Sequence, residues 1–311
     1  MSTELPLLAI DGGQSSTRFR IGDATGVLPP VRTGEPLEQQ ISGAIRTALS
    51  QRSQAGPIRV AAGYSGLLPE AIDPARILEE CAGLGVRSVH LAHDSISGYL
   101  SCLGEQPGAC VAVGTGVVAL STGPTGFARI DGWGHLLGDA GSGYWIGRRG
   151  LEAAMRAHDG RGQDTGLLAE LQADFPDVES AYIQIQSMEQ RVAFVASYAR
   201  KVIELAGRDA VARRIVEQAC DELVHSLDTG LRRVGWAPGC APAISWVGNI
   251  ATNQMVDGLL RGKMLQQWPQ ARILPAGGTP LDGVALLPGL PGEHPLSSQV
   301  LHAQRSASAM R

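Results

Sequence analysis

Two glycine turns and an aspartate at a strand end are the residues of this chain that could handle a phosphate group. The first turn follows an apolar run and reads Asp11-Gly12-Gly13-Gln14-Ser15-Ser16-Thr17. Glycines let backbone N–H groups approach phosphate oxygens, hydroxyls add donors, and a carboxylate can hold Mg²⁺ directly or through water. An ordinary Asp-Gly-Gly hairpin turn has the same local spacing. The turn alone therefore leaves both interpretations open.

The second turn, Gly114-Thr115-Gly116, again lies between two predicted strands. Such turns are common, and this one gains weight because it repeats the geometry of the first. Two such turns on two domains could hold the two ends of a triphosphate from opposite sides of a cleft. A third glycine, in Gly248-Asn249, ends the predicted strand Ala243–Val247 and could admit an adenine or ribose by close backbone approach.

Asp94 follows a predicted strand and precedes a helix, at the end of the strand where open α/β sheets place their ligands. It could be a helix N-cap, as many aspartates are. It could also accept a proton from an attacking hydroxyl, the modest base help that phosphoryl transfer uses. His90 and His93 precede it, but residues three apart in a strand point to opposite faces, which disfavours a metal site there.

The segment Asp131–Gly147 holds six glycines, two of the five tryptophans, a histidine and two aspartates. Tryptophan side chains favour burial and glycines cost entropy to order, so a solvent loop is a poor interpretation. Backbone polar groups beside aromatic rings and a carboxylate suit a sugar, whereas a tight turn in the domain core is the alternative. The candidate sugar ligands are Gly132, Trp133, Gly134, His135 and Asp139.

Composition narrows the classes of function. The chain has 311 residues, 40 glycines and a net charge of −4, and its only two lysines are Lys201 and Lys263. The lysine scarcity argues against Schiff-base chemistry and a lysine-based phosphate loop. The interspersed charges disfavour nucleic acid as a partner, because no basic stripe is present. No apolar stretch approaches the ~20 residues that span a membrane, and the N-terminus lacks the basic region of a signal peptide.

The five cysteines have no metal-like spacing, which indicates reduced structural thiols in the cytoplasm.

The elements that position these residues alternate between short strands and helices, which predicts an α/β layer fold. Leu5–Ile10 and Thr17–Ile21 are predicted to form a hairpin, and Asp73–Leu84 a helix with an aspartate N-cap. The stretch 151–234 is predicted to be a helical insertion, and 297–307 a last short helix.

In this order, the four glycine- and aspartate-bearing elements resemble the N-acetylglucosamine kinase branch of the actin-like, hexokinase-like and Hsp70-like ATPase superfamily, also known as the BadF/BadG/BcrA/BcrD ATPase type. The resemblance runs from Leu7 to about Leu287 and is most specific over Gly132–Gly147. It implies two ribonuclease-H-like α/β domains around a central nucleotide and sugar cleft. The expected domains are 1–116 and 117–296, with the C-terminal helix 297–311 as a candidate to complete the first.

The resemblance also implies roles for the residues. The turn Asp11–Thr17 would be the first phosphate loop, with Mg²⁺ bound near Asp11, and Gly114–Gly116 the second. Gly248 and Asn249 would contact the adenosine. Asp94 matches the family's base near the sugar 6-hydroxyl, and Asp139 matches its hexosamine-binding carboxylate. The chain departs from the family pattern at Val117, Ala140 and Asn249, and the segment Val31–Leu37 has no counterpart of the asparagine that many relatives direct at the sugar hydroxyls.

The expected activity is ATP-dependent phosphorylation of the 6-hydroxyl of N-acetylglucosamine or glucosamine. The enzyme is expected in the cytoplasm, and the resemblance implies a homodimer. Three alternatives stay open: a kinase for another sugar, an ATPase that drives electron transfer into a partner reductase, and a non-catalytic sugar sensor. The reductase-coupled ATPases carry cysteines for an iron–sulfur cluster, whereas the cysteines here are scattered. The presence of all three aspartates, Asp11, Asp94 and Asp139, disfavours the sensor.

Overall fold

The computed structural model describes residues 5–13, 16–32, 34–51 and 56–305. The chain divides into two compact units. Unit 1 contains Met1–Gln106 and Gly277–Arg311, and unit 2 contains Pro107–Ala276. Each unit is built on one mixed sheet, so the predicted α/β class is confirmed.

Unit 1 contains a six-stranded sheet in the order β11-β5-β4-β1-β2-β3. Its first three strands form an antiparallel meander, while β4 and β5 run parallel to β1. The predicted first hairpin is therefore confirmed. The strands of this sheet are β1 (Leu7–Gly12), β2 (Thr17–Ile21), β3 (Ala24–Leu28), β4 (Ile58–Tyr64), β5 (Val86–His93) and β11 (Leu301–Gln304).

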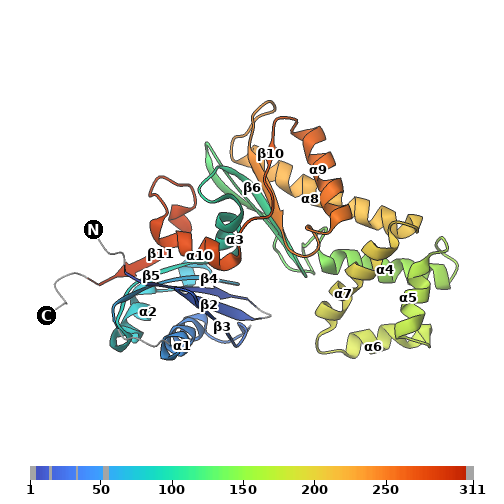
Figure 1. Ribbon diagram of the computed structural model, residues 1–311. Coiled ribbons are helices and arrows are strands. Elements are labelled where there is room, and N and C mark those ends of the chain that lie inside the picture. The colour runs from blue at the N-terminus through green and yellow to red at the C-terminus, as the bar shows by residue number, and fades with distance from the viewer. Residues whose placement is uncertain (1–4, 14–15, 33, 52–55, 306–311) are drawn as a thin grey trace. The chain divides into compact units, whose positions relative to one another are not determined.

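Helices cover both faces of the unit 1 sheet. Figure 1 shows α1 and α2 on one face and α3 and α10 on the other. The first face is apolar because Ile41, Ile45 and Ile77 pack into the core. Asp73 caps α2 by accepting a hydrogen bond from the Ala75 N–H, as its place before Pro74 predicts. The four helices are α1 (Leu37–Ser50), α2 (Pro74–Glu80), α3 (Asp94–Leu103) and α10 (Pro280–Leu286).

Unit 2 contains a five-stranded sheet in the order β10-β9-β6-β7-β8. It repeats the connectivity of unit 1, because an antiparallel meander comes first and two strands parallel to its first strand follow. The strands are β6 (Gly108–Val113), β7 (Val117–Gly123), β8 (Gly126–Ile130), β9 (Ala243–Val247) and β10 (Arg272–Ile273).

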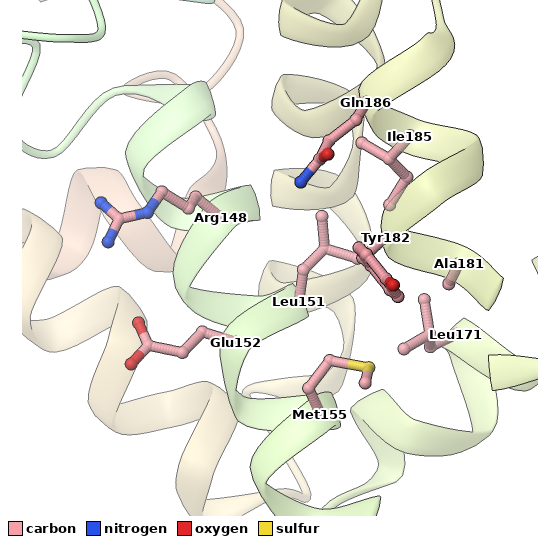
Figure 2. Close-up of a pocket in the computed structure, with 9 residues that line it drawn as sticks. All are labelled: Arg148, Leu151, Glu152, Met155, Leu171, Ala181, Tyr182, Ile185 and Gln186. Atoms are coloured by element: carbon pink, nitrogen blue, oxygen red, sulfur yellow. The ribbon is translucent and has the colours of Figure 1, made fainter. Parts of the chain in front are cut away.

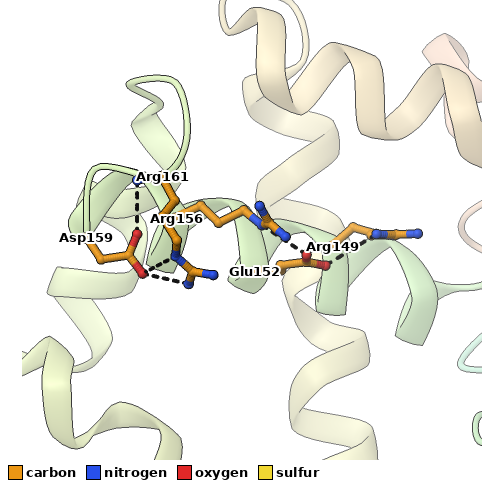
Figure 3. Close-up of polar contacts among 5 residues, drawn as sticks. All are labelled: Arg149, Glu152, Arg156, Asp159 and Arg161. Atoms are coloured by element: carbon orange, nitrogen blue, oxygen red, sulfur yellow. Dashed lines mark hydrogen bonds and ion pairs between the residues drawn. The ribbon is translucent and has the colours of Figure 1, made fainter.

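Several helices lie between β8 and β9 in the chain. They pack into the hydrophobic core of unit 2. Two glycines of α4 allow its close packing with α7, because a side chain at Gly147 would overlap the Val195 carbonyl and one at Gly150 would overlap the Val202 side chain. Along the exposed side of α4, Glu152 pairs with Arg149 and Arg156, and Asp159 pairs with Arg161 (Figure 3). The helices of unit 2 are α4 (Gly143–His158), α5 (Gly166–Asp174), α6 (Ala181–Ser187), α7 (Arg191–Leu205), α8 (Ala210–Arg233) and α9 (Gln254–Gln267).

The division of the chain differs from the expected boundaries at 116/117 and 296. Strand β6 pairs with β7 and β9, so it belongs to unit 2, and the boundary falls at 106/107. Segment 277–296 belongs to unit 1, because α10 packs on α3 and Arg20 forms an ion pair with Asp282 at 2.7 Å. Strand pairing and helix packing between distant segments decide both boundaries.

The prediction of a C-terminal helix is wrong for the described part of 297–311. After a short turn at Ser297–Gln299, Leu301–Gln304 forms β11 and pairs antiparallel with β5. The edge of β5 offers unpaired backbone groups, and pairing with them outweighs the local helical preference of the segment. Among the described residues, no helix combines the length and the apolar character needed to cross a bilayer.

Candidate phosphoryl-transfer site

The carboxyl ends of three parallel strands bring the unit 1 candidates together. In the ladder, Asp11 of β1 is opposite Gly63 of β4, and Gly63 is opposite Ala92 of β5. Asp94 follows two residues later as the first residue of α3. Helix α3 packs closely on β4, because a side chain at Gly63 would overlap the Ser97 hydroxyl. Asp11 and Asp94 therefore lie at one end of the same sheet.

The electrostatics of Asp11 reflect this neighbourhood. Burial raises the pKa of Asp11 to about 6, the charge of Asp94 adds to the rise, and Arg18 on β2 opposes it. Two carboxylates that interact in a partly buried place favour a bound cation, which would relieve their repulsion.

Tyr64 fixes the conformation of the first turn. Its ring occupies the space that a side chain at Gly12 would need, and the ring is almost completely buried. The Tyr64 hydroxyl is buried without a hydrogen-bond partner among the described residues. Burial raises the pKa of Tyr64, and the charge of Asp11 adds to the rise. Gly12 is thus required for close packing against a neutral phenol.

The rest of the first turn is only partly described. The Gly13 N–H donates to the Ser16 carbonyl at 3.1 Å, which closes the turn, and Thr17 is buried at the start of β2. Gln14 and Ser15 lie outside the described residues. The role of the turn in phosphate binding stays a prediction.

Asp94 contacts the histidine that precedes it. The His93 Nδ1 lies 2.9 Å from the Asp94 Oδ1, and the Asp94 side chain is 34% exposed. The same Nδ1 accepts the Ser95 N–H at 3.1 Å and so caps α3. Asp94 is therefore the first residue of the helix rather than its N-cap, and its carboxyl is partly exposed beside His93.

In unit 2, the turn Gly114–Gly116 joins β6 to β7. The Gly114 N–H donates to the Gly116 carbonyl at 2.9 Å, and Gly114 and Thr115 are exposed. Helix α4 begins directly beside this turn, because the Gly143 N–H donates to the Gly114 carbonyl at 2.8 Å. The Tyr144 N–H likewise donates to the Thr115 carbonyl at 3.0 Å, so the first N–H groups of α4 hold the glycine turn in place.

Gly248 lies at the same end of the unit 2 sheet. Strand β9 runs parallel to β6, with Val247 opposite Ala112. Gly248 has φ +97° and would overlap the Val113 carbonyl if it carried a side chain, so glycine is required here. Asn249 follows it and is exposed. The predicted second phosphate loop and adenosine contact thus lie on neighbouring strand ends.

Asp131 organises the glycine-rich segment after β8. Its Oδ1 accepts the Asp139 N–H at 2.8 Å, and its Oδ2 accepts the Ala140 N–H at 3.1 Å. Asp131 and Asp139 have φ +58° and φ +61°, values that non-glycine residues rarely adopt. Strained backbone of this kind is concentrated at functional sites.

Asp139 lies beneath the second glycine turn. Its Oδ1 accepts the Val117 N–H at 3.3 Å, and its Oδ2 would be 2.7 Å from a side chain at Gly116. The residue is only 8% exposed, and burial raises its pKa, with a further rise from Asp131. The structure thus connects the predicted sugar carboxylate to the predicted phosphate loop.

The other sugar candidates are more open. Trp133 is 60% exposed and stacks under the Arg129 guanidinium, whose nitrogen donates to the Gly132 carbonyl at 2.6 Å. The His135 ring packs on Tyr144, and Gly134 is exposed. Their accessible backbone and ring surfaces are compatible with a ligand, and their role in sugar binding stays a prediction.

A cavity of about 260 Å³ lies elsewhere, among α4, α5 and α6. Figure 2 shows that its interior is formed mainly by apolar side chains, including Leu151, Met155 and Ile185. Its charged lining residues are Arg148 and Glu152, and no pair of carboxylates like Asp11 and Asp94 lines it. The candidate site is therefore assigned to the strand ends and not to this cavity.

The residues of the candidate site fit an Mg²⁺ ion that is held mainly by the phosphates of a substrate. Within the described part of the chain, no group of three or more His, Cys, Asp or Glu side chains could form a protein-only metal site. Mg²⁺ keeps several waters and uses one or two carboxylates together with phosphates. Asp11, with Asp94 nearby, supplies that kind of partial site.

Sequence reasoning missed the structural roles of Tyr64, His93 and Asp131. Asp131 carries a local signal, because an aspartate before Gly132 at a strand end favours a left-handed turn. Tyr64 carries none, because its contact with Gly12 depends on strand pairing. His93 was considered only as a metal ligand, whereas it caps α3 and contacts Asp94.

Two curated proteins are similar to this chain in sequence. N-acetyl-D-glucosamine kinase of Dictyostelium discoideum is 30% identical over 192 residues, which cover 59% of this chain and 60% of that protein. N-acetylmuramic acid/N-acetylglucosamine kinase of Clostridium acetobutylicum is 34% identical over 130 residues, covering 40% and 42% of the two chains. The chain thus spans less than two thirds of the length of these curated relatives.

A solved structure from Chromobacterium violaceum, of a protein proposed to be an N-acetylglucosamine kinase, has the same fold. Its TM-score is 0.71 at 21% identity, with 91% of this chain and 99% of that chain covered. The sequence pattern of the BadF/BadG/BcrA/BcrD ATPase family matches residues 8–278. Because that match covers most of the sequence, this chain belongs to the BadF/BadG/BcrA/BcrD ATPase family.

Proposed function

We propose that this protein is an ATP-dependent amino-sugar kinase that phosphorylates the 6-hydroxyl of N-acetylglucosamine or glucosamine. The names of the two curated relatives support the sugar class. The observation that carries the proposal is the pairing of Asp11 and Asp94 at the carboxyl end of the unit 1 sheet. This pair supplies a cation-binding carboxylate and a second, more exposed carboxylate in one place.

In this proposal the two carboxylates have different tasks. Asp94 orients the sugar hydroxyl and accepts its proton, while Asp11 holds Mg²⁺. When bound, Mg²⁺ neutralises charge on the β- and γ-phosphates. The raised pKa of Asp11 supports this task, because a cation would offset the burial and the repulsion that cause it.

Unit 2 supplies donors rather than charge. We infer that Gly114–Gly116 binds phosphate through backbone N–H groups and that Gly248-Asn249 contacts the adenosine. Both lysines are occupied elsewhere: Lys201 pairs with Asp174 at 2.9 Å, and Lys263 pairs with Asp221. In this proposal, phosphate binding without lysine depends mainly on backbone N–H groups, hydroxyls and Mg²⁺.

The decisive variant is Asp94→Asn. We expect kcat to fall about 10²–10⁴-fold, the usual contribution of general base catalysis, while ATP and sugar still bind. Asp73→Asn is the matched control, since Asp73 also stands at a helix start of unit 1 and asparagine keeps its cap. Near-normal turnover in Asp94→Asn would refute the assignment of the base.

The sugar is identified by an ADP-release assay with glucosamine, N-acetylglucosamine, N-acetylmannosamine, muramic acids and glucose. We expect the largest kcat/KM for N-acetylglucosamine or glucosamine. A preference for another sugar would support the assignment as a kinase but would change the assigned substrate. An equal response with and without every sugar would favour an ATPase coupled to a partner reductase.

The cysteine positions do not support that ATPase. Cys81 and Cys102 belong to unit 1, and Cys110, Cys220 and Cys240 to unit 2. All but Cys240 are buried, whereas a cluster shared between subunits needs accessible thiolates.

We also propose that the protein acts in the cytoplasm as a homodimer. The free cysteines support a reducing compartment, and the dimer rests on the family resemblance. Light scattering on purified protein tests the dimer, with a monomer mass as the contrary result.

A further inference from the structure

Arg129 carries a partly buried positive charge that has no ion-pair partner among the described residues. It lies near the end of β8, and its Nη2 donates to the Gly132 carbonyl at 2.6 Å. Its Nε is buried and has no hydrogen-bond partner in the described part of the chain. A guanidinium presents five N–H donors, and a charged donor that stays unpaired away from water costs free energy. The donors of Arg129 are therefore suited to an additional, negatively charged acceptor.

The nearest carboxylate in the sequence, that of Asp131, does not pair with this charge. Its Oδ1 accepts the Asp139 N–H at 2.8 Å, and its Oδ2 accepts the Ala140 N–H at 3.1 Å. Backbone N–H groups stabilise a carboxylate without the help of a cation. Asp131 therefore maintains the glycine-rich segment, and the charge of Arg129 is left for another partner.

Trp133 holds the guanidinium in a defined orientation. The Arg129 Cζ lies 5.1 Å from the centroid of the Trp133 ring, and the Trp133 side chain is 60% exposed. Stacking uses the flat face of the guanidinium, so the N–H groups along its edge stay available. That edge matches the two oxygens of a carboxylate, which it can bind through parallel hydrogen bonds. An aromatic surface and an anion-binding edge thus lie side by side.

This pair lies next to the predicted sugar carboxylate. A side chain at Gly132 would be 2.9 Å from the Arg129 Nη2 and 3.0 Å from the Val118 side chain. A side chain at Gly116 would be 2.7 Å from the Asp139 Oδ2. Gly116 and Val118 are two positions apart at the start of β7, so they face the same side of the sheet at a separation of about 7 Å. A sugar with one substituent can span that separation.

We propose that Arg129, held by Trp133, binds a carboxylate substituent of the sugar. The inference rests on the proposed function and extends its substrate class to derivatives of N-acetylglucosamine that carry an acidic group. The 6-hydroxyl is the phosphate acceptor, so the acidic group belongs on another ring position. A nucleotide phosphate fits less well, because the turn Gly114–Gly116 lies at the strand end, whereas Arg129 is opposite Leu120, further along the sheet.

The test uses sugars that differ in one group. N-acetylmuramic acid is N-acetylglucosamine with a lactyl ether that ends in a carboxylate, and its methyl ester has the same shape without the charge. We expect the wild type to phosphorylate the acid with a kcat/KM at least tenfold above that of the ester, as a hydrogen-bonded ion pair provides. Equal values for acid and ester would overturn the proposal, because the site would then not detect the charge.

Arg129→Gln removes the charge but keeps an amide that can donate to the Gly132 carbonyl. We expect its ratio of kcat/KM for acid over ester to fall to about one. Arg129→Lys, which keeps the charge but loses the fork of donors, should have an intermediate ratio. The control is Arg208→Gln, at the exposed turn between α7 and α8, which should keep the wild-type ratio. Equal losses for acid and ester in Arg129→Gln would show that Arg129 only braces the loop, and would overturn the proposal.

The same kinetics separate this subsite from other roles. A higher KM for ATP in Arg129→Gln, equal with every sugar, would place Arg129 on the nucleotide and overturn the inference. A wild type that phosphorylates N-acetylglucosamine and refuses the acid would also overturn it, while the proposed function would stand. A wild type that phosphorylates neither sugar would refute the proposed function.

Calorimetric titration tests the subsite without turnover. We expect the wild type to bind N-acetylmuramic acid at least tenfold more tightly than its methyl ester, and Arg129→Gln to bind the two alike. A thermal melt of each variant checks that it is folded. Equal affinities of the wild type for acid and ester would overturn the inference even if the protein phosphorylated no sugar.

Discussion

The two sheets of this protein have the same strand connectivity but carry different chemistry at their carboxyl ends. In unit 1, the turn after the first strand begins with Asp11, and the β5 end leads into Asp94. In unit 2, the turn after the first strand is Gly114–Gly116, and Gly248-Asn249 follows β9, the counterpart of β4; neither segment contains an acid. One end presents carboxylates and the other presents backbone donors.

The difference shows how one strand topology can provide opposite electrostatic environments, as the proposed phosphoryl transfer would require. A carboxylate in unit 2 would repel phosphate, and the one that lies near its turn, Asp139, is buried and bonded to the Val117 N–H. Charge in unit 1 suits a cation and a proton. The same topology therefore supports opposite electrostatic roles.

The largest expected effect tests whether both turns depend on close packing. In Gly12→Ala the new methyl overlaps the buried Tyr64 ring, and we expect a loss of about 3 kcal/mol in the free energy of unfolding. Gly116→Ala should lose less stability, because its new methyl group would meet the Asp139 carboxylate oxygen, at 2.7 Å, and not a buried ring. Gly114→Ala is the control, since no atom lies within 4 Å of its new methyl group. Urea unfolding measures all three, and equal stabilities would contradict the packing argument.

Asp131→Ala asks whether the glycine-rich segment of unit 2 depends on one carboxylate. The Asp139 and Ala140 N–H groups lose their acceptor, so we expect a loss of about 2 kcal/mol in the free energy of unfolding and a higher KM for the sugar. Asp131→Asn, which keeps one acceptor oxygen, should lose less. An unchanged Tm and KM in Asp131→Ala would show that the glycine-rich segment keeps its conformation without the Asp131 carboxylate.

Asp11→Asn tests how much the negative charge of Asp11, at the carboxyl end of the unit 1 sheet, lowers the stability of the protein. Its pKa rises from 3.8 to about 6 on folding, so the folded state holds this proton more tightly than the unfolded state. The contribution of Asp11 to stability therefore falls as pH rises from about 3.8 to 6 and stays low above that. Without Mg²⁺ at pH 7, we expect Asp11→Asn to be more stable than the wild type by about 1–2 kcal/mol.

The same variant should lose activity. Mg²⁺ should raise the Tm of the wild type in the presence of ATP and have less effect on Asp11→Asn. Asp23→Asn, in the exposed turn between β2 and β3, is the control. A wild type whose stability rises between pH 4 and 6 relative to Asp11→Asn would contradict the sign.

The smallest effect concerns the two lysines of unit 2. The double variant Lys201→Met and Lys263→Met should keep kcat and the KM for ATP within about twofold, because both ammonium groups are held in helix ion pairs. We expect a stability loss of about 1 kcal/mol or less. A tenfold rise in the KM for ATP would show that a lysine binds phosphate after all.

Much of the local structure could be predicted from the sequence. Thr17–Ile21 and Ala243–Val247 have the predicted bounds, and Asp73 caps α2 as expected. Strand β3, Ala24–Leu28, was missed because its residues include glycine and few strongly β-forming side chains. The long helical stretch was predicted from residue 151, whereas α4 already begins at Gly143.

The site was predictable in part. Asp94 lies at the carboxyl end of its strand as expected, and the glycine turns join the strands that the pattern indicates. The contact of Asp139 with Val117 was not predictable, because it joins residues 22 positions apart through a left-handed backbone.

By itself, the sequence determined the features that depend on neighbouring residues: the glycine turns, the helix starts and the alternation of strands and helices. The tertiary structure decided which sheet β6 joins, that Leu301–Gln304 is a strand, and that Tyr64 packs on Gly12. The physical reason is that backbone pairing and side-chain contacts between distant segments depend on the partner that the fold provides. Propensity and periodicity describe one segment at a time.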